Sequence, residues 1–192
     1  MNTKTILICG VGGQGVLTAS DLLSDVLLEA GRNVKKSEVH GMSQRGGDVL
    51  CTVRFGEQVF SPISALGEAS YLLAFEKLEA LRHINSLNPA GSVLANDFVW
   101  EPVPVAAGFE QYPEGIEETL KKYAREVVMI PATRMALELG NEKATNVILI
   151  GLLASRTDIA KEVWMRVVER KVPPRSVDLN LKAFEKGYSF AR

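Results

Sequence analysis

Hydrophobic residues follow two different periods along this chain, and the two periods alternate from the first residues onward. An uninterrupted apolar run, TILICG at 5–10, ends in glycine and is typical of a strand buried on both faces. Apolar positions at helical spacing then extend from Val16 to Ala30, and Gly31 occupies the position that follows many helices. The run NVKKSEV at 33–39 predicts a second strand. The chain therefore opens as strand, helix, strand.

The next segment changes to strict alternation, which predicts a strand with one buried face. Within 48–56 the apolar residues on one side are Val49, Cys51, Val53 and Phe55. Gly56 and Glu57 then predict a turn, and QVFSP at 58–62 predicts the returning strand of an antiparallel hairpin. We therefore expect a hairpin inserted after the second strand.

The second half of the chain repeats the alternation of strands and helices. Strands are predicted at 71–76, 91–97 and 126–132, and helices at 77–87, 116–125, 144–157, 158–171 and 177–188. The proline-rich stretch 101–115 predicts an excursion with a short extended piece. Together these elements predict one α/β domain over residues 1–192, with three layers, a Rossmann-like and mostly parallel sheet, and the inserted antiparallel hairpin.

Composition and charge exclude several classes of function. The chain has 192 residues, 46% of them apolar, and a formal net charge of -1. It lacks the basic excess that binding to a phosphate backbone needs, so we expect no nucleic-acid partner. The apolar run before the first glycine is too short for a signal peptide, and the longest later run, VILIGLLA at 147–154, is far too short to span a membrane. We therefore expect a cytoplasmic protein with no membrane partner.

The cysteines and histidines are too few for the common metal centres. Cys9 and Cys51 each lie in an apolar, strand-like run and are expected in the core. A four-iron cluster and a structural zinc site each need four ligands, which this chain alone does not offer at ligand spacing. His40 and His83 are the only histidines and fall in different kinds of segment. The sequence therefore predicts no metal site.

The glycine turn after the first strand is the first candidate for a binding site. Gly10, Gly12 and Gly15 form G-x-G-x-x-G between a strand and a helix, where backbone N–H groups can approach a phosphate. A nicotinamide dinucleotide site also needs a carboxylate about twenty residues further on, and this chain has Lys35 and Lys36 there. A tight turn without any ligand is the alternative interpretation.

A second candidate loop lies between the two strands at 33–39 and 48–56. It contains polar residues beside glycines: His40, Ser43, Gln44 and Arg45 beside Gly41, Gly46 and Gly47. An arginine next to two glycines presents a rigid donor fork beside exposed N–H groups, which suits a carboxylate or a phosphate. The alternatives are an arginine in a structural ion pair and a histidine that bonds only a neighbouring carbonyl.

Two long motifs in the same order resemble a known family. GVGGQGV at 10–16 is followed by SEVHGMSQRGG at 37–47 and VRFG at 53–56, and this order resembles the gamma-type subunits of the 2-oxoacid:ferredoxin oxidoreductases. Within that family the chain is most similar to the indolepyruvate type. The resemblance covers nearly the whole chain and includes GNEKATNVILIGLLA at 140–154, where Lys143 stands at a position at which arginine is at least as familiar.

The resemblance implies a subunit of a heteromeric enzyme. Such an enzyme oxidatively decarboxylates an aryl 2-oxoacid on thiamine diphosphate, forms an acyl-coenzyme A and passes electrons through iron–sulfur clusters to ferredoxin. The larger partner subunit would carry the thiamine and the clusters, and this chain alone would bind no cofactor and hold no catalytic residue. This chain would cover the active site and help to bind the oxoacid or coenzyme A.

On that interpretation a set of residues faces the partner's active site or the co-substrate. The resemblance implies Gly12, Gly13, Gln14, Gly15, His40, Ser43, Gln44, Arg45, Gly46, Gly47 and Asn146. Thr145 lies beside Asn146 at a predicted helix start, where ordinary capping explains both residues equally well. Two other functions remain open: a self-contained nicotinamide-dependent dehydrogenase, and a free-standing nucleotide- or coenzyme A-binding module.

Overall fold

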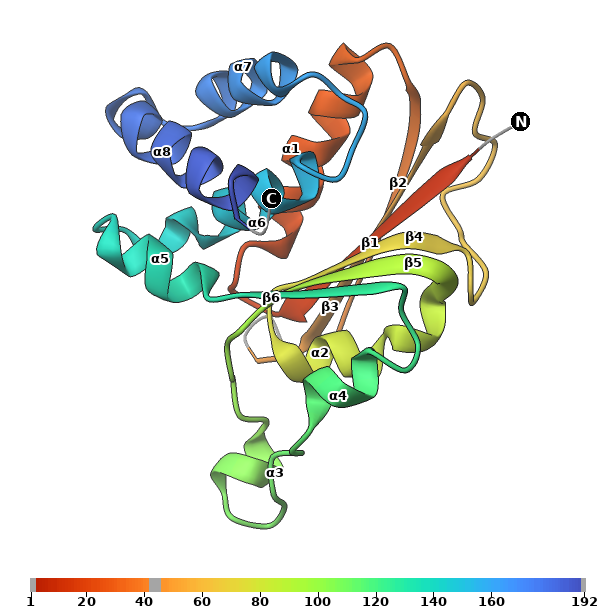
Figure 1. Cartoon of the computed structure of the whole chain (residues 1–192), viewed down its shortest axis with the longest axis vertical. Helices are drawn as coiled ribbons and strands as arrows, with labels where there is room; N and C mark the ends of the chain where they lie inside the picture. Colours follow the sequence, from red (N-terminus) through yellow and green to blue (C-terminus); the bar gives the residue numbers. More distant parts are fainter. Residues whose placement is uncertain (1–2, 42–45, 191–192) are drawn as a thin grey trace.

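A six-stranded sheet forms the centre of the protein (Figure 1). The computed structural model describes residues 3–41 and 46–190. The strand order is β2-β3-β1-β4-β5-β6, with bounds β1 (Lys4–Val11), β2 (Asn33–His40), β3 (Asp48–Gly56), β4 (Ala69–Ala74), β5 (Leu87–Asn96) and β6 (Glu126–Ile130). Strands β1, β4, β5 and β6 run parallel, whereas β3 is antiparallel to both of its neighbours. The predicted α/β fold with a mostly parallel sheet is confirmed.

The antiparallel hairpin is present, but the predicted returning strand was wrong. β3 pairs with β2 from Asn33 opposite Gly56 to His40 opposite Val49, so the hairpin turn is the loop between His40 and Asp48. Residues 58–62 form no strand. The other edge of β3 is already bonded to β1, so β3 has no free edge on which a further strand could pair.

A layer of helices covers one face of the sheet (Figure 1). They are α1 (Val16–Glu29), α5 (Ala132–Glu138), α6 (Thr145–Ala154), α7 (Lys161–Lys171) and α8 (Val177–Tyr188). Alternate residues of β1, Ile6 and Ile8, point into this layer and are fully buried. α6 is apolar on nearly all sides and is buried among the other helices, as its composition requires. Helix α5 was not predicted, because the apolar run of β6 was extended to residue 132.

The opposite face carries a thinner layer. Helix α2 (Lys77–Arg82), the 3₁₀ turn η1 (Ile84–Ser86) and helix α4 (Ile116–Leu120) pack against Leu7 and Cys9 of β1. The predicted excursion 101–115 projects away from the body, but it contains a short helix, α3 (Val103–Ala106), in place of the expected extended piece (Figure 1). A proline in the first turn explains this helix, because its fixed φ suits a helix start.

Helices α6 and α8 pack unusually close together because a glycine lies at each side of their contact. A Cβ added to Gly187 would lie 1.9 Å from the carbonyl oxygen of Ile148. A Cβ added to Gly151 would lie 2.2 Å from the carbonyl oxygen of Phe184. The two backbones therefore touch directly at this crossing. Among the residues that the structure describes, no helix is both long enough and apolar enough to cross a membrane.

Candidate functional site

A cleft of about 520 Å³ lies where the parallel strands end. Its lining comes from the glycine turn after β1, from Phe75 after β4, from the stretch Asn96–Trp100 at the end of β5, and from the start of α6. In open α/β sheets, ligands bind outside the carboxyl ends of the strands, where neighbouring crossover helices lie on opposite faces. Here α1 and α2 lie on opposite faces, so this cleft has the position expected of a binding site.

The glycine turn opens the start of α1 toward the cleft. Gly13 and Gly15 both adopt positive φ, at 105° and 89°, a conformation that other residues rarely adopt. Gly15 is the N-cap of α1, and no side chain caps this helix. The first N–H groups of α1 and its positive dipole end are therefore suited to an anion in the cleft.

Gln14 holds this turn in place. Its Oε1 accepts a hydrogen bond from the backbone N–H of Val11 at 2.7 Å, and its Nε2 donates to the carbonyl oxygen of Phe75 at 3.4 Å. The side chain thus ties the end of β1 to the residue after β4. A long amide at this position, which is unusual for a dinucleotide turn, is explained by this structural role.

We expect Gln14→Ala to lower the free energy of unfolding by about 1–3 kcal/mol, because the buried N–H of Val11 loses its acceptor. Urea denaturation of the variant and of wild type measures the difference. Gln58→Ala is the matched control, since Gln58 is exposed, and it should change stability little. Equal effects of the two substitutions would show that the Gln14 bonds do not support the turn.

The fold brings the two sequence motifs together through their backbones. The N–H of Gly12 donates a hydrogen bond to the carbonyl oxygen of Gly47 at 2.8 Å. In return, the N–H of Gly46 donates to the carbonyl oxygen of Gly12 at 3.4 Å. His40 ends β2 opposite Val49. The remaining predicted residues of this loop, Ser43, Gln44 and Arg45, lie outside the described residues, and their assignment stays a prediction.

The start of α6 forms the wall opposite the glycine turn. Asn146 lies against Gly15, because a Cβ added to Gly15 would be 3.3 Å from Nδ2 of Asn146. Thr145 is buried and donates its hydroxyl to the carbonyl oxygen of Glu142 at 2.7 Å, so it does not cap α6. Lys143 is exposed, lines the cleft and forms no ion pair with any residue in the described part of the chain. A cation without a partner beside a helix N-terminus favours an anionic ligand.

Sequence reasoning missed the floor of the cleft. Asn96 is fully buried and joins the end of β5 to the residue after β4 and to the first turn of α5. Its Nδ2 donates to the carbonyl oxygen of Phe75 at 3.1 Å and to Oγ1 of Thr133 at 2.8 Å, and its Oδ1 accepts from the N–H of Thr133 at 3.3 Å. Phe98 and Trp100 meet edge to face with ring centroids 6.5 Å apart. The available signal was the position of these residues at the end of a predicted strand, where the sites of α/β proteins form.

A second cleft of about 530 Å³ continues along α1 and α6. It shares Thr18, Lys143 and Asn146 with the first cleft. Its lining also includes two basic residues, Lys171 and Arg175, of which Lys171 is paired with Asp25. The two clefts therefore adjoin each other, and Lys143 lines both of them.

The two cysteines line neither cleft. Both are fully buried, Cys9 on the α2 side of the sheet and Cys51 on the α1 side, as the sequence predicted. Burial raises the pKa of the Cys9 thiol well above its ordinary value and also raises the pKa of Cys51. Both thiols are therefore protonated at neutral pH and neither acts as a nucleophile.

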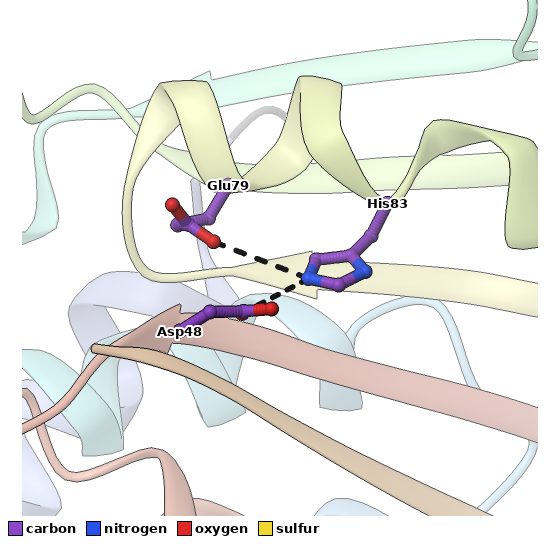
Figure 2. A group of neighbouring side chains, drawn as sticks. All are labelled: Asp48, Glu79 and His83. Atoms are coloured by element: carbon purple, nitrogen blue, oxygen red, sulfur yellow. Dashed lines mark hydrogen bonds and ion pairs between the residues drawn. The ribbon is translucent and has the colours of Figure 1, made fainter. Parts of the chain in front are cut away.

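A group of titratable side chains lies near the glycine turn, on the α2 side of the sheet. Glu76 caps α2 and accepts hydrogen bonds from the N–H groups of Glu79 and Trp100, at 3.0 and 3.2 Å. Glu79, Asp48 and His83 lie close to one another (Figure 2). Burial raises the pKa of Glu79 to about 7. The positive charge of Arg82 opposes this rise in pKa, whereas the negative charge of Asp48 adds to it.

The strand order does not suit a dinucleotide site. In dinucleotide-binding folds the second strand lies next to the first, so that an acidic residue at its end reaches the ribose. Here β3 lies between β1 and β2. The second strand is therefore farther from the glycine turn by one strand spacing, roughly 4.8 Å. Lys36 in β2 is paired with Asp21 and Glu38. The glycine motif is therefore present without the rest of a dinucleotide site.

Comparison with known proteins agrees with this geometry. Residues 5–190 match the family described as pyruvate ferredoxin/flavodoxin oxidoreductase. The chain is 42% identical to the indolepyruvate oxidoreductase subunit IorB of Thermococcus kodakarensis, over 100% of this chain and 98% of that protein.

Two solved structures share the fold. One is the gamma subunit of a keto/oxoacid ferredoxin oxidoreductase from Geobacter sulfurreducens, with a TM-score of 0.72, 22% identity and coverage of 96% of both chains. The other is the 2-oxoglutarate:ferredoxin oxidoreductase of Magnetococcus marinus, with a TM-score of 0.76 and 19% identity over 100% of this chain and 31% of that chain. The family match and the full-length similarity to the Thermococcus kodakarensis protein together establish that the chain belongs to the pyruvate ferredoxin/flavodoxin oxidoreductase family.

Proposed function

We propose that this chain is the subunit without iron–sulfur clusters of a heteromeric 2-oxoacid:ferredoxin oxidoreductase of the indolepyruvate type. Its similarity to an indolepyruvate oxidoreductase subunit over its full length supports the activity and the substrate class. In this role the chain acts in the cytoplasm and contributes to oxidative decarboxylation of an aryl 2-oxoacid to an acyl-coenzyme A, with ferredoxin as the electron acceptor.

The observation that carries the role of this subunit is Lys143 at the junction of the two clefts. Coenzyme A is a long molecule with phosphates at one end and a thiol at the other. The adjoining clefts beside Lys143 and the uncapped start of α1 suit the anionic part of such a molecule. The aromatic floor at Phe98 and Trp100 suits its apolar part or the aryl group of the oxoacid.

Thiamine diphosphate and the iron–sulfur clusters belong, on this proposal, to a larger partner subunit. The two buried cysteines support this division, because they lie on opposite faces of the sheet and cannot share a cluster. The Magnetococcus marinus enzyme, in which the matching region is 31% of a longer chain, supports a close structural association with the rest of such an enzyme.

A self-contained nicotinamide-dependent dehydrogenase is not favoured, and neither is a free-standing nucleotide- or coenzyme A-binding module. The strand order separates the glycine turn from β2, which removes the ribose contact that a dehydrogenase needs. The full-length similarity to an oxidoreductase subunit disfavours a free-standing module.

Reconstitution tests the proposal. We expect the purified chain to be colourless and to turn over no 2-oxoacid by itself, whereas mixing it with the larger partner subunit should give ferredoxin reduction with indolepyruvate and coenzyme A. The larger subunit alone is the control. Turnover by the isolated chain, or full activity of the larger subunit without this chain, would contradict the proposal.

A further inference from the structure

We propose that Asp48, Glu79 and His83 form a binding site for one divalent transition-metal ion. The three side chains come from two elements, Asp48 from the first residue of β3 and the other two from α2 and the residue that follows it. Figure 2 shows both carboxylates turned toward the same nitrogen of the imidazole ring. None of the three lines either cleft, so this site is distinct from the proposed substrate path.

The three potential ligand atoms converge on one point. Nε2 of His83 lies 3.0 Å from Oδ1 of Asp48 and 3.9 Å from Oε2 of Glu79, and the three ligand atoms all lie within 4.8 Å of one another. Ligand atoms around a tetrahedral zinc ion lie roughly 3.5 Å apart, given bonds of about 2.0–2.2 Å. Small rotations of the carboxylates therefore bring all three atoms into bonding distance of a metal.

Glu79 supplies an independent reason for a cation. Its side chain is only 6% exposed, and its Oε1 is paired with Arg82 at 3.2 Å. Its Oε2 is buried, points toward the other two side chains, and has no hydrogen-bond partner among the described residues (Figure 2). A buried carboxylate oxygen without a partner is costly. The imidazole nitrogen can donate only one proton, so it cannot satisfy both carboxylates, whereas a cation between them can.

The donor set selects the kind of metal. One imidazole nitrogen with two carboxylate oxygens suits Zn²⁺, Fe²⁺, Co²⁺ or Mn²⁺, whereas Ca²⁺ and Mg²⁺ prefer oxygen ligands alone. The side chain of Asp48 is 42% exposed, which leaves an open side for water to complete the coordination. The expected site therefore has three protein ligands and at least one water.

Such an ion would join the base of the β2–β3 loop to α2. Asp48 directly follows Gly47, whose carbonyl oxygen accepts the hydrogen bond from Gly12, and the carbonyl oxygen of Asp48 accepts one from Gly41 at 3.1 Å. The metal would thus fix both sides of the hairpin turn against the helix that follows β4. Its binding is expected to stabilise the folded chain.

Metal binding to the full chain tests this inference. The chain is treated with a chelator, dialysed, and titrated with Zn²⁺ by calorimetry and with Co²⁺ by visible absorption spectroscopy. We expect one equivalent of Zn²⁺ with a micromolar or tighter Kd, a rise in melting temperature, and Co²⁺ d–d bands that are much more intense than those of the aqua ion. His83→Gln and Asp48→Asn should each weaken Zn²⁺ binding at least tenfold and remove the intensification of the Co²⁺ bands.

Asp158→Asn is the matched control, because Asp158 is an exposed aspartate in a surface ion pair with Arg32, and it should bind Zn²⁺ like wild type. Circular dichroism before titration confirms that each variant is folded. A millimolar Kd in wild type, or equal Zn²⁺ affinity in wild type and folded His83→Gln, would overturn the inference. Both readouts measure binding directly, so either result is independent of the proposed catalytic function.

Discussion

Replacing Gly187 by alanine is expected to destabilise the protein by about 2 kcal/mol, which corresponds to a fall in melting temperature of roughly 4–8 °C. Alanine is the better helix former by about 1 kcal/mol, so helix propensity alone predicts the opposite sign. The packing of α6 on α8 decides the result. The new Cβ would lie 1.9 Å from the carbonyl oxygen of Ile148, so the two helices would have to separate and lose buried contacts.

Thermal and urea denaturation measure this effect, with a control variant and a second glycine variant for comparison. Gly41→Ala is the control, because the nearest atom to a Cβ there is 3.9 Å away and the residue has no positive φ. Gly151→Ala should destabilise as Gly187→Ala does, and the double variant should cost less than the sum, since one separation of the helices relieves both overlaps. A Gly187→Ala variant as stable as wild type would show that the helices do not pack this closely in solution.

Reversing the charge of Lys143 is expected to lower kcat/KM of the reconstituted enzyme by one to two orders of magnitude. A charge-assisted contact contributes roughly 1.5–3 kcal/mol, and each 1.4 kcal/mol corresponds to a factor of ten. Lys143→Glu removes that contact and adds repulsion against an anion at the start of α1. The melting temperature of the isolated chain should change little, because this side chain is exposed and forms no ion pair with the residues described here.

Steady-state kinetics with coenzyme A and the oxoacid varied in turn identifies the ligand. A rise in KM for one substrate alone assigns the cleft to that substrate. Lys122→Glu is the matched control, because Lys122 is also exposed but lines neither cleft, and its kinetics should equal those of wild type. Unchanged kcat/KM for both substrates in Lys143→Glu would remove Lys143 from the site.

Local patterns predicted most of the elements because each pattern reports burial of a single segment. The apolar run of β1 and the all-apolar stretch of α6 indicate segments buried on all sides, and both are. Alternation along β3 identified its buried face, with Val49, Cys51 and Val53 in the core. Alternation does not identify the neighbouring strand, however, because pairing depends on residues far away in the chain. The hairpin was therefore expected with residues 58–62, whereas β3 pairs with β1 and β2.

One part of the candidate site could be located from the sequence, and the other part could not. The glycine turn could be located from the sequence, because glycine at Gly13 and Gly15 reports a backbone conformation that other residues avoid. The floor of the cleft could not be located, since Phe75, Asn96 and Thr133 are single residues in three separate segments, after β4, at the end of β5 and in the first turn of α5, without any recognisable spacing. Strand order alone brings them together.

Sequence patterns were enough to identify the class of fold, the order and type of most elements, the place of the glycine turn and the family to which the chain belongs. Three features became visible only in the folded chain: the insertion of β3 between β1 and β2, the hydrogen bonds by which Gln14 supports the glycine turn, and the contact of Asp48 with His83, 35 positions apart in the sequence. The physical reason is that periodicity and backbone preference act over a few neighbouring residues, whereas strand pairing and side-chain contacts depend on which distant segments the folded core places side by side.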